Sequence, residues 1–176
     1  MENETGDVLL IGYGNPGRLD DGLGPALARE IEKLDIPGVN VDADYQLNVE
    51  DAAEAARHHT VVFADADTGG PEPFWLKRIE PAGSGVSFSS HSVDPRAILA
   101  LARDLFGAEP EAFLLGIRGY EFNGFGEGLS ERAEANLAAA AKHLEEALRR
   151  GAIEEIRPEG WDHSRLRTGT ESEDDR

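Results

Sequence analysis

Residues 8–43 read VLLIGYGNPGRLDDGLGPALAREIEKLDIPGVNVDA and predict a strand, a helix and a second strand. The apolar run Val8–Gly12 has the composition of a buried strand. The helix that follows is indicated by apolar residues that share one face, namely Leu23, Leu27, Ile31 and Leu34. Val39–Ala43 is again short and rich in β-branched residues. Two strands joined by a helix are expected to run parallel in one sheet.

The rest of the chain continues this alternation. Three further strands are predicted, at Val61–Ala64, Phe74–Ile79 and Phe113–Ile117. Three further helices are predicted from their N-caps and apolar stripes: Val49–His58 after Asn48, a helix after Asp94-Pro95 with Ile98, Leu101, Ala102 and Leu105 on one face, and a last helix after Ser130 with Leu137, Ala140, Ala141, Leu144 and Leu148. The expected fold class is therefore α/β. We predict a three-layer α/β/α domain with a five-stranded, mostly parallel twisted sheet, in which Phe74–Ile79 is the antiparallel edge strand.

Composition limits both the domain count and the partners. With 176 residues, 40% of them hydrophobic, the chain is expected to form one domain over residues 1–157, followed by an acidic disordered tail at 158–176. The absence of cysteine excludes disulfides and thiolate chemistry. The formal charge of −18 argues against a nucleic-acid partner. The polar, acidic start and the lack of a long apolar run predict a cytoplasmic protein without membrane contact, and we expect a monomer.

In parallel α/β sheets the ligand lies outside the carboxyl ends of the strands. This rule directs attention to the three loops at 12–24, 42–48 and 65–70. Asp65 directly follows an apolar strand and is therefore a candidate site residue. Asp67 precedes Thr-Gly-Gly and is predicted to form a turn.

The first loop contains a G-x-G-x-x-G pattern at Gly12, Gly14 and Gly17 that is typical of dinucleotide sites. Pro16 removes a backbone donor from this loop, and residues 18–21 delay the helix. Asp20 and Asp21 also place negative charge where a pyrophosphate needs donors. These three features argue against nucleotide binding. One acid of the pair is expected to be a helix N-cap, a role that asparagine also fills.

His91 lies in a loop just before the predicted Asp94 cap and is the candidate histidine. The other histidines are not assigned a function, and His143 is predicted to be exposed on the last helix. Two carboxylates and an imidazole are a ligand set for a divalent metal with open positions. A serine or cysteine nucleophile is not indicated, because the chain has neither G-x-S-x-G nor cysteine.

Three short motifs follow one another along the chain: residues 14–24 read GNPGRLDDGLG, residues 62–66 read VFADA, and residues 90–92 read SHS. They resemble the G-N-x-x-x-x-D-(D/E)-x-x-G opening, the second acidic strand end and the histidine loop of the hydrogenase maturation proteases. These endopeptidases remove the C-terminal extension of the [NiFe]-hydrogenase large-subunit precursor. The similarity covers most of the predicted domain.

The resemblance implies that Asp21, Asp65 and His91 are the metal ligands and the catalytic residues. It also implies that the metal is nickel supplied by the precursor, for which other divalent metals are expected to substitute. Asp20 would then have a structural role, as the N-cap. Asn15 and Asp44 are the candidate substrate-binding residues.

The loop after the second strand departs from the family pattern, which is often D-G-G-T. This chain has DADYQLN at residues 42–48, so Asp44 is the chosen equivalent and Asp42 is the alternative. A non-hydrolytic nucleotide- or metal-binding α/β module is the alternative function. The sequence leaves the group that attacks the peptide bond open between a metal-polarised carbonyl, a metal-activated water and an aspartate acting as base.

Overall fold

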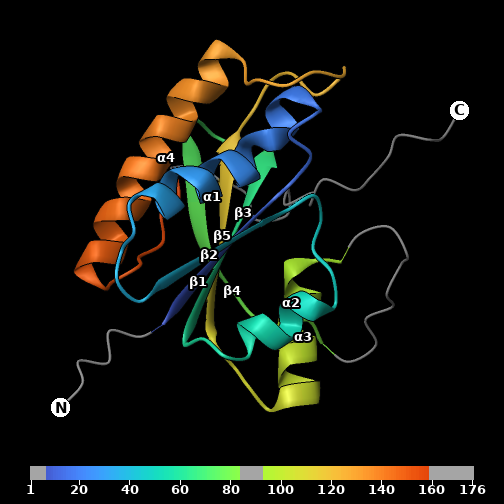
Figure 1. Ribbon diagram of the computed structural model, residues 1–176, viewed down its shortest axis with the longest axis vertical. Coiled ribbons are helices and arrows are strands. Elements are labelled where there is room, and N and C mark those ends of the chain that lie inside the picture. The colour runs from blue at the N-terminus through green and yellow to red at the C-terminus, as the bar shows by residue number, and fades with distance from the viewer. Residues whose placement is uncertain (1–6, 84–92, 159–176) are drawn as a thin grey trace, which may run out of the picture.

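The computed structural model describes residues 7–83 and 93–158, which form a five-stranded sheet between helices (Figure 1). The strands are β1 Val8–Tyr13, β2 Val39–Asp44, β3 Thr60–Asp67, β4 Phe74–Ile79 and β5 Glu111–Arg118, in the order β2-β1-β3-β5-β4. β1 pairs in parallel with β2 and β3, and β3 pairs in parallel with β5. Only β4 is antiparallel among these strands, and it lies at the edge beside β5. The predicted fold class is confirmed.

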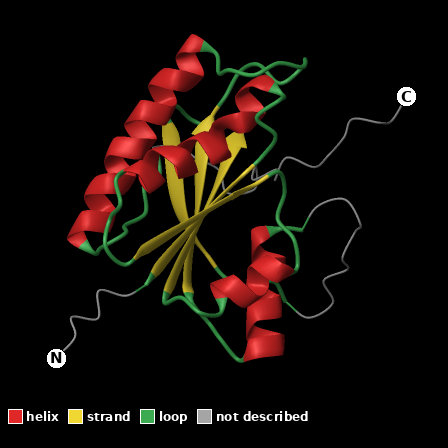
Figure 2. Cartoon of the chain, viewed as in Figure 1, coloured by secondary structure: helices red, strands yellow, loops and turns green. Residues whose placement is uncertain are grey.

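The helices cover both faces of the sheet (Figure 2). They are α1 Leu23–Lys33, α2 Glu50–Ala55, α3 Pro95–Phe106 and α4 Glu131–Arg150, and a 3-10 turn, η1 Leu19–Gly22, precedes α1. α1 and α4 lie side by side on one face, whereas α2 and α3 cover the other. None of the helices in the described ranges is long and apolar enough to cross a membrane.

Each face of the sheet has its own apolar core because side chains alternate along a strand. In β1, Leu10 belongs to the cluster under α1 and α4, while Leu9 and Ile11 belong to the cluster under α2 and α3. The predicted stripe of α1 is confirmed, since Leu23, Leu27 and Ile31 are buried. Burial of these side chains fixes the position of α1 against the sheet.

The predicted helix caps are largely confirmed. The Asp94 carboxylate accepts a hydrogen bond from the Arg96 amide at 2.7 Å, and the Ser130 hydroxyl accepts one from the Ala133 amide at 3.3 Å. Asn48 accepts from the Glu50 amide at 3.0 Å, but the N-cap of α2 is Val49 and not Asn48 as predicted. α2 also ends at Ala55 and does not reach His58.

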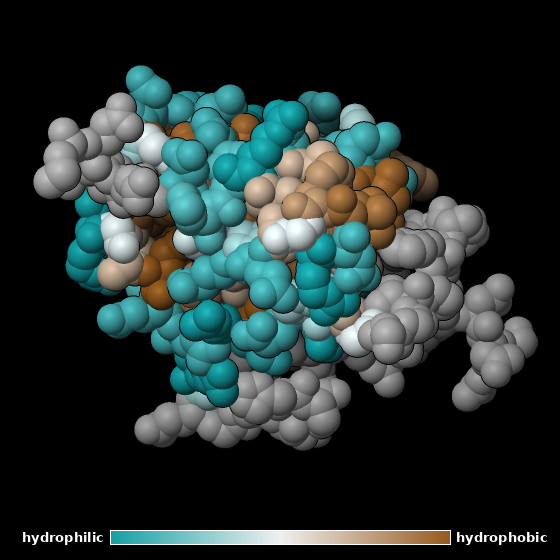
Figure 3. All heavy atoms as spheres, turned by 90° about the horizontal axis from the view of Figure 1, so that it is seen from below, coloured by the Kyte–Doolittle hydropathy of each residue, from teal (hydrophilic) through white to brown (hydrophobic). Residues whose placement is uncertain are grey.

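The apolar stripe of α3 is shorter than its periodicity predicts. Burial stops at Ala102, and the side chains of Leu105 and Phe106 are 67% and 53% exposed. Hydrophobic spacing alone does not show where a helix leaves the core. The view from below, toward the α2 and α3 end, shows apolar surface between larger hydrophilic areas (Figure 3).

The outer edge of β4 is covered by the chain that follows α4. The backbones of Leu76 and Ile156 exchange two hydrogen bonds, at 3.0 and 2.8 Å, and Glu155 accepts a third from the Arg78 amide at 2.9 Å. The division into a domain of residues 1–157 and a tail stays a prediction, since residues 159–176 lie outside the described part.

Candidate active site

The candidate site lies at the carboxyl ends of three neighbouring strands. Tyr13 ends β1 and pairs with Asp44, the last residue of β2. On the other side of β1, Gly12 pairs with Ala64 of β3, so that Asp65 follows at the level of Tyr13. The predicted strand-end loops therefore meet at one edge of the sheet, as the parallel topology requires.

The glycine loop brings Asp21 back toward this edge. A Cβ at Gly12 would lie 2.1 Å from the backbone oxygen of Gly24, so α1 packs directly on the backbone of β1. Beyond it, the Gly17 amide donates to Asn15 Oδ1 and the Asn15 amide donates to Asp21 Oδ2, each at 2.9 Å. These amide donors are already used within the loop. The glycines thus serve close packing and a tight turn, which supports the prediction that the loop is not a phosphate cradle.

Asp65 lies close to Asp21 and has a strongly altered acidity. Burial raises the pKa of Asp65 to about 8, and the negative charge of Asp21 adds to this rise. The Ala66 amide, which donates to Asp65 Oδ1 at 2.8 Å, and the Tyr13 hydroxyl oppose the shift. At neutral pH the carboxyl therefore retains a proton, which a bound cation would displace.

Tyr13 is a site residue that the sequence analysis missed. Its hydroxyl hydrogen-bonds to Asp65, and burial followed by the charges of Asp65 and Asp94 raises its pKa well above the ordinary value. Its position in the strand could have identified it. Side chains alternate along β1, so Tyr13 lies on the same face of the sheet as Leu9 and Ile11, which is the face that Asp65 shares with Phe63.

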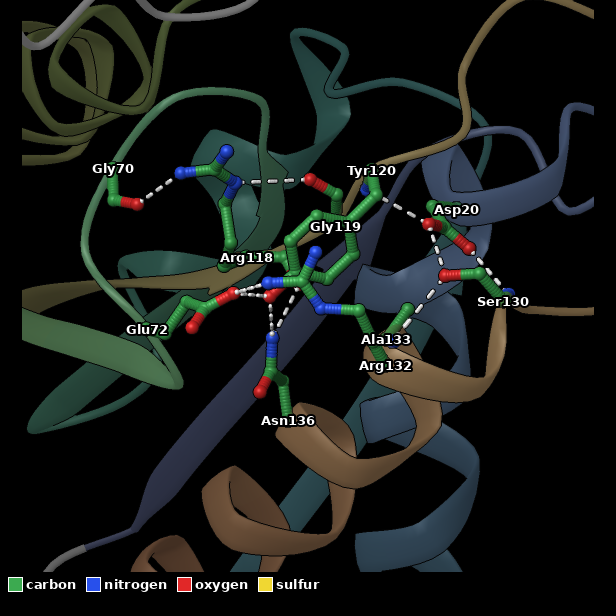
Figure 4. Close-up of polar contacts among 10 residues, drawn as sticks. All are labelled: Asp20, Gly70, Glu72, Arg118, Gly119, Tyr120, Ser130, Arg132, Ala133 and Asn136. Atoms are coloured by element: carbon green, nitrogen blue, oxygen red, sulfur yellow. Dashed lines mark hydrogen bonds and ion pairs between the residues drawn. The ribbon is translucent and has the colours of Figure 1, made fainter.

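The prediction that Asp20 is a helix N-cap is wrong. The N-cap of α1 is Gly22, and no side chain caps it. Asp20 is instead fully buried and accepts hydrogen bonds from the loop between β5 and α4, as Figure 4 shows. Its Oδ1 accepts from the Ser130 amide at 2.7 Å, and its Oδ2 accepts from the Tyr120 amide, the Glu121 amide and the Ser130 hydroxyl at 2.8, 2.9 and 2.7 Å. Asp20 therefore has a structural role, but one that joins two distant loops.

Asp44 and Asp42 differ in their relation to the glycine loop. The backbone oxygen of Asp44 accepts from the Gly14 amide at 3.0 Å, and its carboxylate accepts from the Tyr45 amide at 2.8 Å and the Asn48 side chain at 3.3 Å. Asp42 is exposed and lies two residues earlier, opposite Ile11. This register supports Asp44 over Asp42 as the residue nearer the site.

Solved structures with the same fold include several hydrogenase maturation proteases. The chain resembles the Escherichia coli hydrogenase maturating endopeptidase HybD with a TM-score of 0.66 and 23% identity, over 85% of this chain and 96% of that one. It resembles the [NiFe] hydrogenase maturation protease HycI of Thermococcus kodakarensis with a TM-score of 0.64 and 23% identity, over 81% and 93% of the two chains. The hydrogenase 2 maturation peptidase of a Thaumarchaeota archaeon gives a TM-score of 0.59 and 24% identity, over 80% and 97%.

The chain has the fold of the hydrogenase maturation proteases. Neither a family model nor a curated protein matches its sequence.

Within this maturation-protease fold, the third candidate ligand, His91, lies outside the described residues. The described part begins again at Val93, which packs against the core under α2 and α3. Asp94 is close enough to Tyr13 for its charge to raise the pKa of the phenol. In the described ranges no three acidic or histidine side chains form a metal cluster. The three-residue ligand set therefore stays a prediction.

A second polar cluster lies beyond the end of β5 in this fold and was also missed (Figure 4). The Tyr120 hydroxyl donates to Glu72, and Asn136 Nδ2 donates to that hydroxyl at 2.8 Å. The guanidinium carbon of Arg132 lies 4.0 Å from the centre of the Tyr120 ring, and that of Arg118 lies at 5.2 Å. This cluster anchors the loop that Asp20 also holds.

Two further predictions can be compared with the structure. Asp67 Oδ1 accepts from the Gly69 amide at 3.2 Å, so its predicted role in a turn is confirmed, and Oδ2 accepts from Trp75 Nε1 at 2.6 Å. His143 is not exposed as predicted. It is partly buried, with its ring 5.5 Å from that of Phe74, because α4 turns this position toward β4.

Proposed function

We propose that the chain is an endopeptidase that removes the C-terminal extension of a [NiFe]-hydrogenase large-subunit precursor. One observation carries the proposal: Asp21 of η1 and Asp65 of β3 lie close enough for the charge of Asp21 to raise the pKa of Asp65. The fold supports it, since structures of this shape include hydrogenase maturation proteases. Two neighbouring carboxylates that repel one another when both are ionised are typical of a site that binds a cation.

In this proposal Asp21, Asp65 and His91 bind the nickel ion that the precursor already carries. Carboxylate oxygens and an imidazole suit a divalent ion, and three protein ligands leave positions open for the precursor's own groups. With no thiolate among them, we expect weak binding of the free ion and firm binding only in the complex with the precursor. Nickel insertion would then be a condition for cleavage.

Asn15 and Asp44 are proposed to contact the peptide that is cleaved. Asn15 lies in the same turn as Asp21, to which its amide donates, and Asp44 ends the strand next to β1. An extended peptide across the carboxyl edge of the sheet would pass both. Water would attack the carbonyl carbon of the scissile peptide bond. Either the ion or an aspartate base would activate that water, or the ion would polarise the carbonyl that the water attacks.

The experiment is an in vitro cleavage assay with nickel-loaded and nickel-free precursor, in which mass spectrometry of the intact precursor detects the loss of the extension. We expect the loss of the C-terminal extension only from the nickel-loaded precursor. Asp21→Asn should abolish cleavage. Asp35→Asn is the matched control, because Asp35 is exposed in a left-handed conformation, with φ of 47°, that asparagine tolerates. Full cleavage by Asp21→Asn, or equal cleavage of both precursors, would contradict the proposal.

A further inference from the structure

We propose that Tyr13 is a positioning residue for Asp65, whose carboxylate it orients toward the bound cation by donating a hydrogen bond. The inference rests on the proposed function in one respect, which is that Asp65 binds the metal of the precursor. Tyr13 lies outside the three motifs, and the inference assigns a chemical task to it.

The backbone of Tyr13 is held from two sides. It pairs with Asp44 at the end of the β1–β2 ladder. On the face covered by α1, a Cβ at Gly24 would lie 2.3 Å from the Tyr13 backbone oxygen and 2.5 Å from that of Ala64, the residue before Asp65. One helix turn is therefore packed against the backbones of both strands. Tyr13 and Asp65 thus start from positions that are fixed relative to one another.

The Tyr13 ring lies on the opposite face, against the apolar cluster under α2 and α3 that includes Ile11 and Phe63. Asp65 follows Phe63 at a distance of two residues and therefore shares this face. The packed ring leaves the hydroxyl directed at the carboxylate, with which it forms a hydrogen bond. A phenol that is packed against the core usually has such a partner, and Asp65 provides it.

Asp65 consequently has two donors of different kinds. The Ala66 amide occupies a lone pair of Oδ1 at 2.8 Å, and the Tyr13 hydroxyl occupies another. A carboxylate held by two donors presents its remaining lone pairs in one direction, which lowers the entropy lost when a metal binds. Groups that orient metal ligands in this way typically change metal affinity by about 10- to 100-fold when they are removed.

Phenylalanine at position 13 would keep the ring and remove only the donor. The matched control is Tyr45→Phe, which also removes a tyrosine hydroxyl. The Tyr45 side chain is 69% exposed beside Asp44, so this hydroxyl faces solvent. A role limited to packing would leave metal affinity unchanged in both variants. A positioning role would weaken binding only in Tyr13→Phe.

The test is a Ni²⁺ titration of the full ¹⁵N-labelled chain, followed by paramagnetic broadening of the Asn15 and Ala66 amide signals, with thermal melts alongside. We expect half-maximal broadening of these signals to require about 10- to 100-fold more Ni²⁺ in Tyr13→Phe than in the wild type or Tyr45→Phe. Asp65→Asn should remove the broadening at both amides.

The outcomes separate the two proposals. Equal Ni²⁺ dependence in Tyr13→Phe and the wild type, with loss in Asp65→Asn, would overturn the role of Tyr13 and leave the metal site intact. Broadening that persists in Asp65→Asn, or that is absent from both amides in the wild type, would overturn the ligand assignment and with it the inference. A weaker response in Tyr45→Phe equal to that in Tyr13→Phe would also overturn the inference, because the hydroxyl of Tyr13 would then have no specific effect.

Discussion

Asp20→Asn is the substitution whose outcome depends most directly on the geometry. All four hydrogen bonds to the Asp20 carboxylate come from donors, one to Oδ1 and three to Oδ2. Asparagine has only one acceptor oxygen. In the better orientation its amide nitrogen replaces Oδ1 and faces the Ser130 amide, which is 2.7 Å from Oδ1 in the wild type. Two donors then meet in a buried place.

The expected cost follows from these contacts. An unsatisfied buried donor costs about 1–3 kcal/mol. The three bonds to Oδ2 also lose their charge-assisted character, which adds about 1 kcal/mol or more. We therefore expect Asp20→Asn to lower the free energy of unfolding by about 3 kcal/mol. For a domain of this size, that corresponds to a fall in Tm of about 6–12 °C.

The adjacent residue provides the control. Asp21 is partly exposed, and its carboxylate accepts a hydrogen bond from the Asn15 amide, which an asparagine oxygen can also accept. Asp21→Asn should therefore leave Tm nearly unchanged, or raise it slightly, because a negative charge beside Asp65 is removed. Thermal and urea unfolding of both variants, followed by circular dichroism, measures the contrast.

The pH dependence gives a second measurement on the same variant. Burial alone would raise the pKa of Asp20, but the hydrogen bonds from Ser130, Glu121 and Tyr120 outweigh it and lower the pKa. This stabilisation is present above the unfolded pKa of about 3.9 and is lost as the pH falls through the folded pKa. The gap in stability between wild type and Asp20→Asn should thus be constant near neutrality and shrink below about pH 4. A Tm within about 1–2 °C of the wild type at pH 7 would refute the role of the Asp20 carboxylate in joining the two loops. A loss of only about 1 kcal/mol in the free energy of unfolding would already lower Tm by more than this.

Three further predictions follow from other contacts. Asp65→Asn should raise the free energy of unfolding more at pH 8 than at pH 4. The folded pKa of Asp65 is about 8, so the wild-type protein loses stability as the pH rises from the unfolded pKa toward this value. Equal effects at both pH values in urea titrations would contradict this. Gly24→Ala should lower Tm by well over 10 °C or prevent folding, since its Cβ would lie 2.3 Å from the Tyr13 backbone oxygen. A Tm equal to that of the wild type would show that α1 packs less closely on the sheet. Tyr120→Phe should cost about 1–3 kcal/mol by leaving Asn136 without the hydroxyl that accepts from it, and a double-mutant cycle with Asn136→Ala should show coupling of at least about 0.5 kcal/mol.

The parts of the structure that were predictable from sequence depend on neighbours in the chain. The five strands, the Asp94 and Ser130 caps and the antiparallel edge follow from local periodicity and cap chemistry. The approach of Asp21 to Asp65 was also predictable, since parallel strands bring their carboxyl ends to one edge.

The remainder depends on partners that are distant in the chain. Asp20 binds amides at positions 120, 121 and 130, about a hundred residues away, and nothing near Asp20 in the sequence distinguishes these contacts from a helix cap. The role of Tyr13 was hidden for a related reason, because tyrosine at a strand end is an ordinary β-former. Leu105 shows the reverse error, in which a correct periodicity extends beyond the core.

The short segment at residues 155–156, which pairs with β4 through an isolated bridge, has a consequence for the behaviour of the protein in concentrated solution. Open sheet edges offer unpaired backbone groups to other chains and promote aggregation. Here Leu76 and Arg78 already donate to residues that follow α4, so part of that edge is occupied by the molecule itself. The opposite edge, β2, is six residues long and exposes Asn40 and Asp42, and carboxylates resist the approach of a second acidic chain. Intermolecular strand pairing is therefore opposed at part of each edge, by the segment that already pairs with β4 and by the carboxylate that β2 exposes.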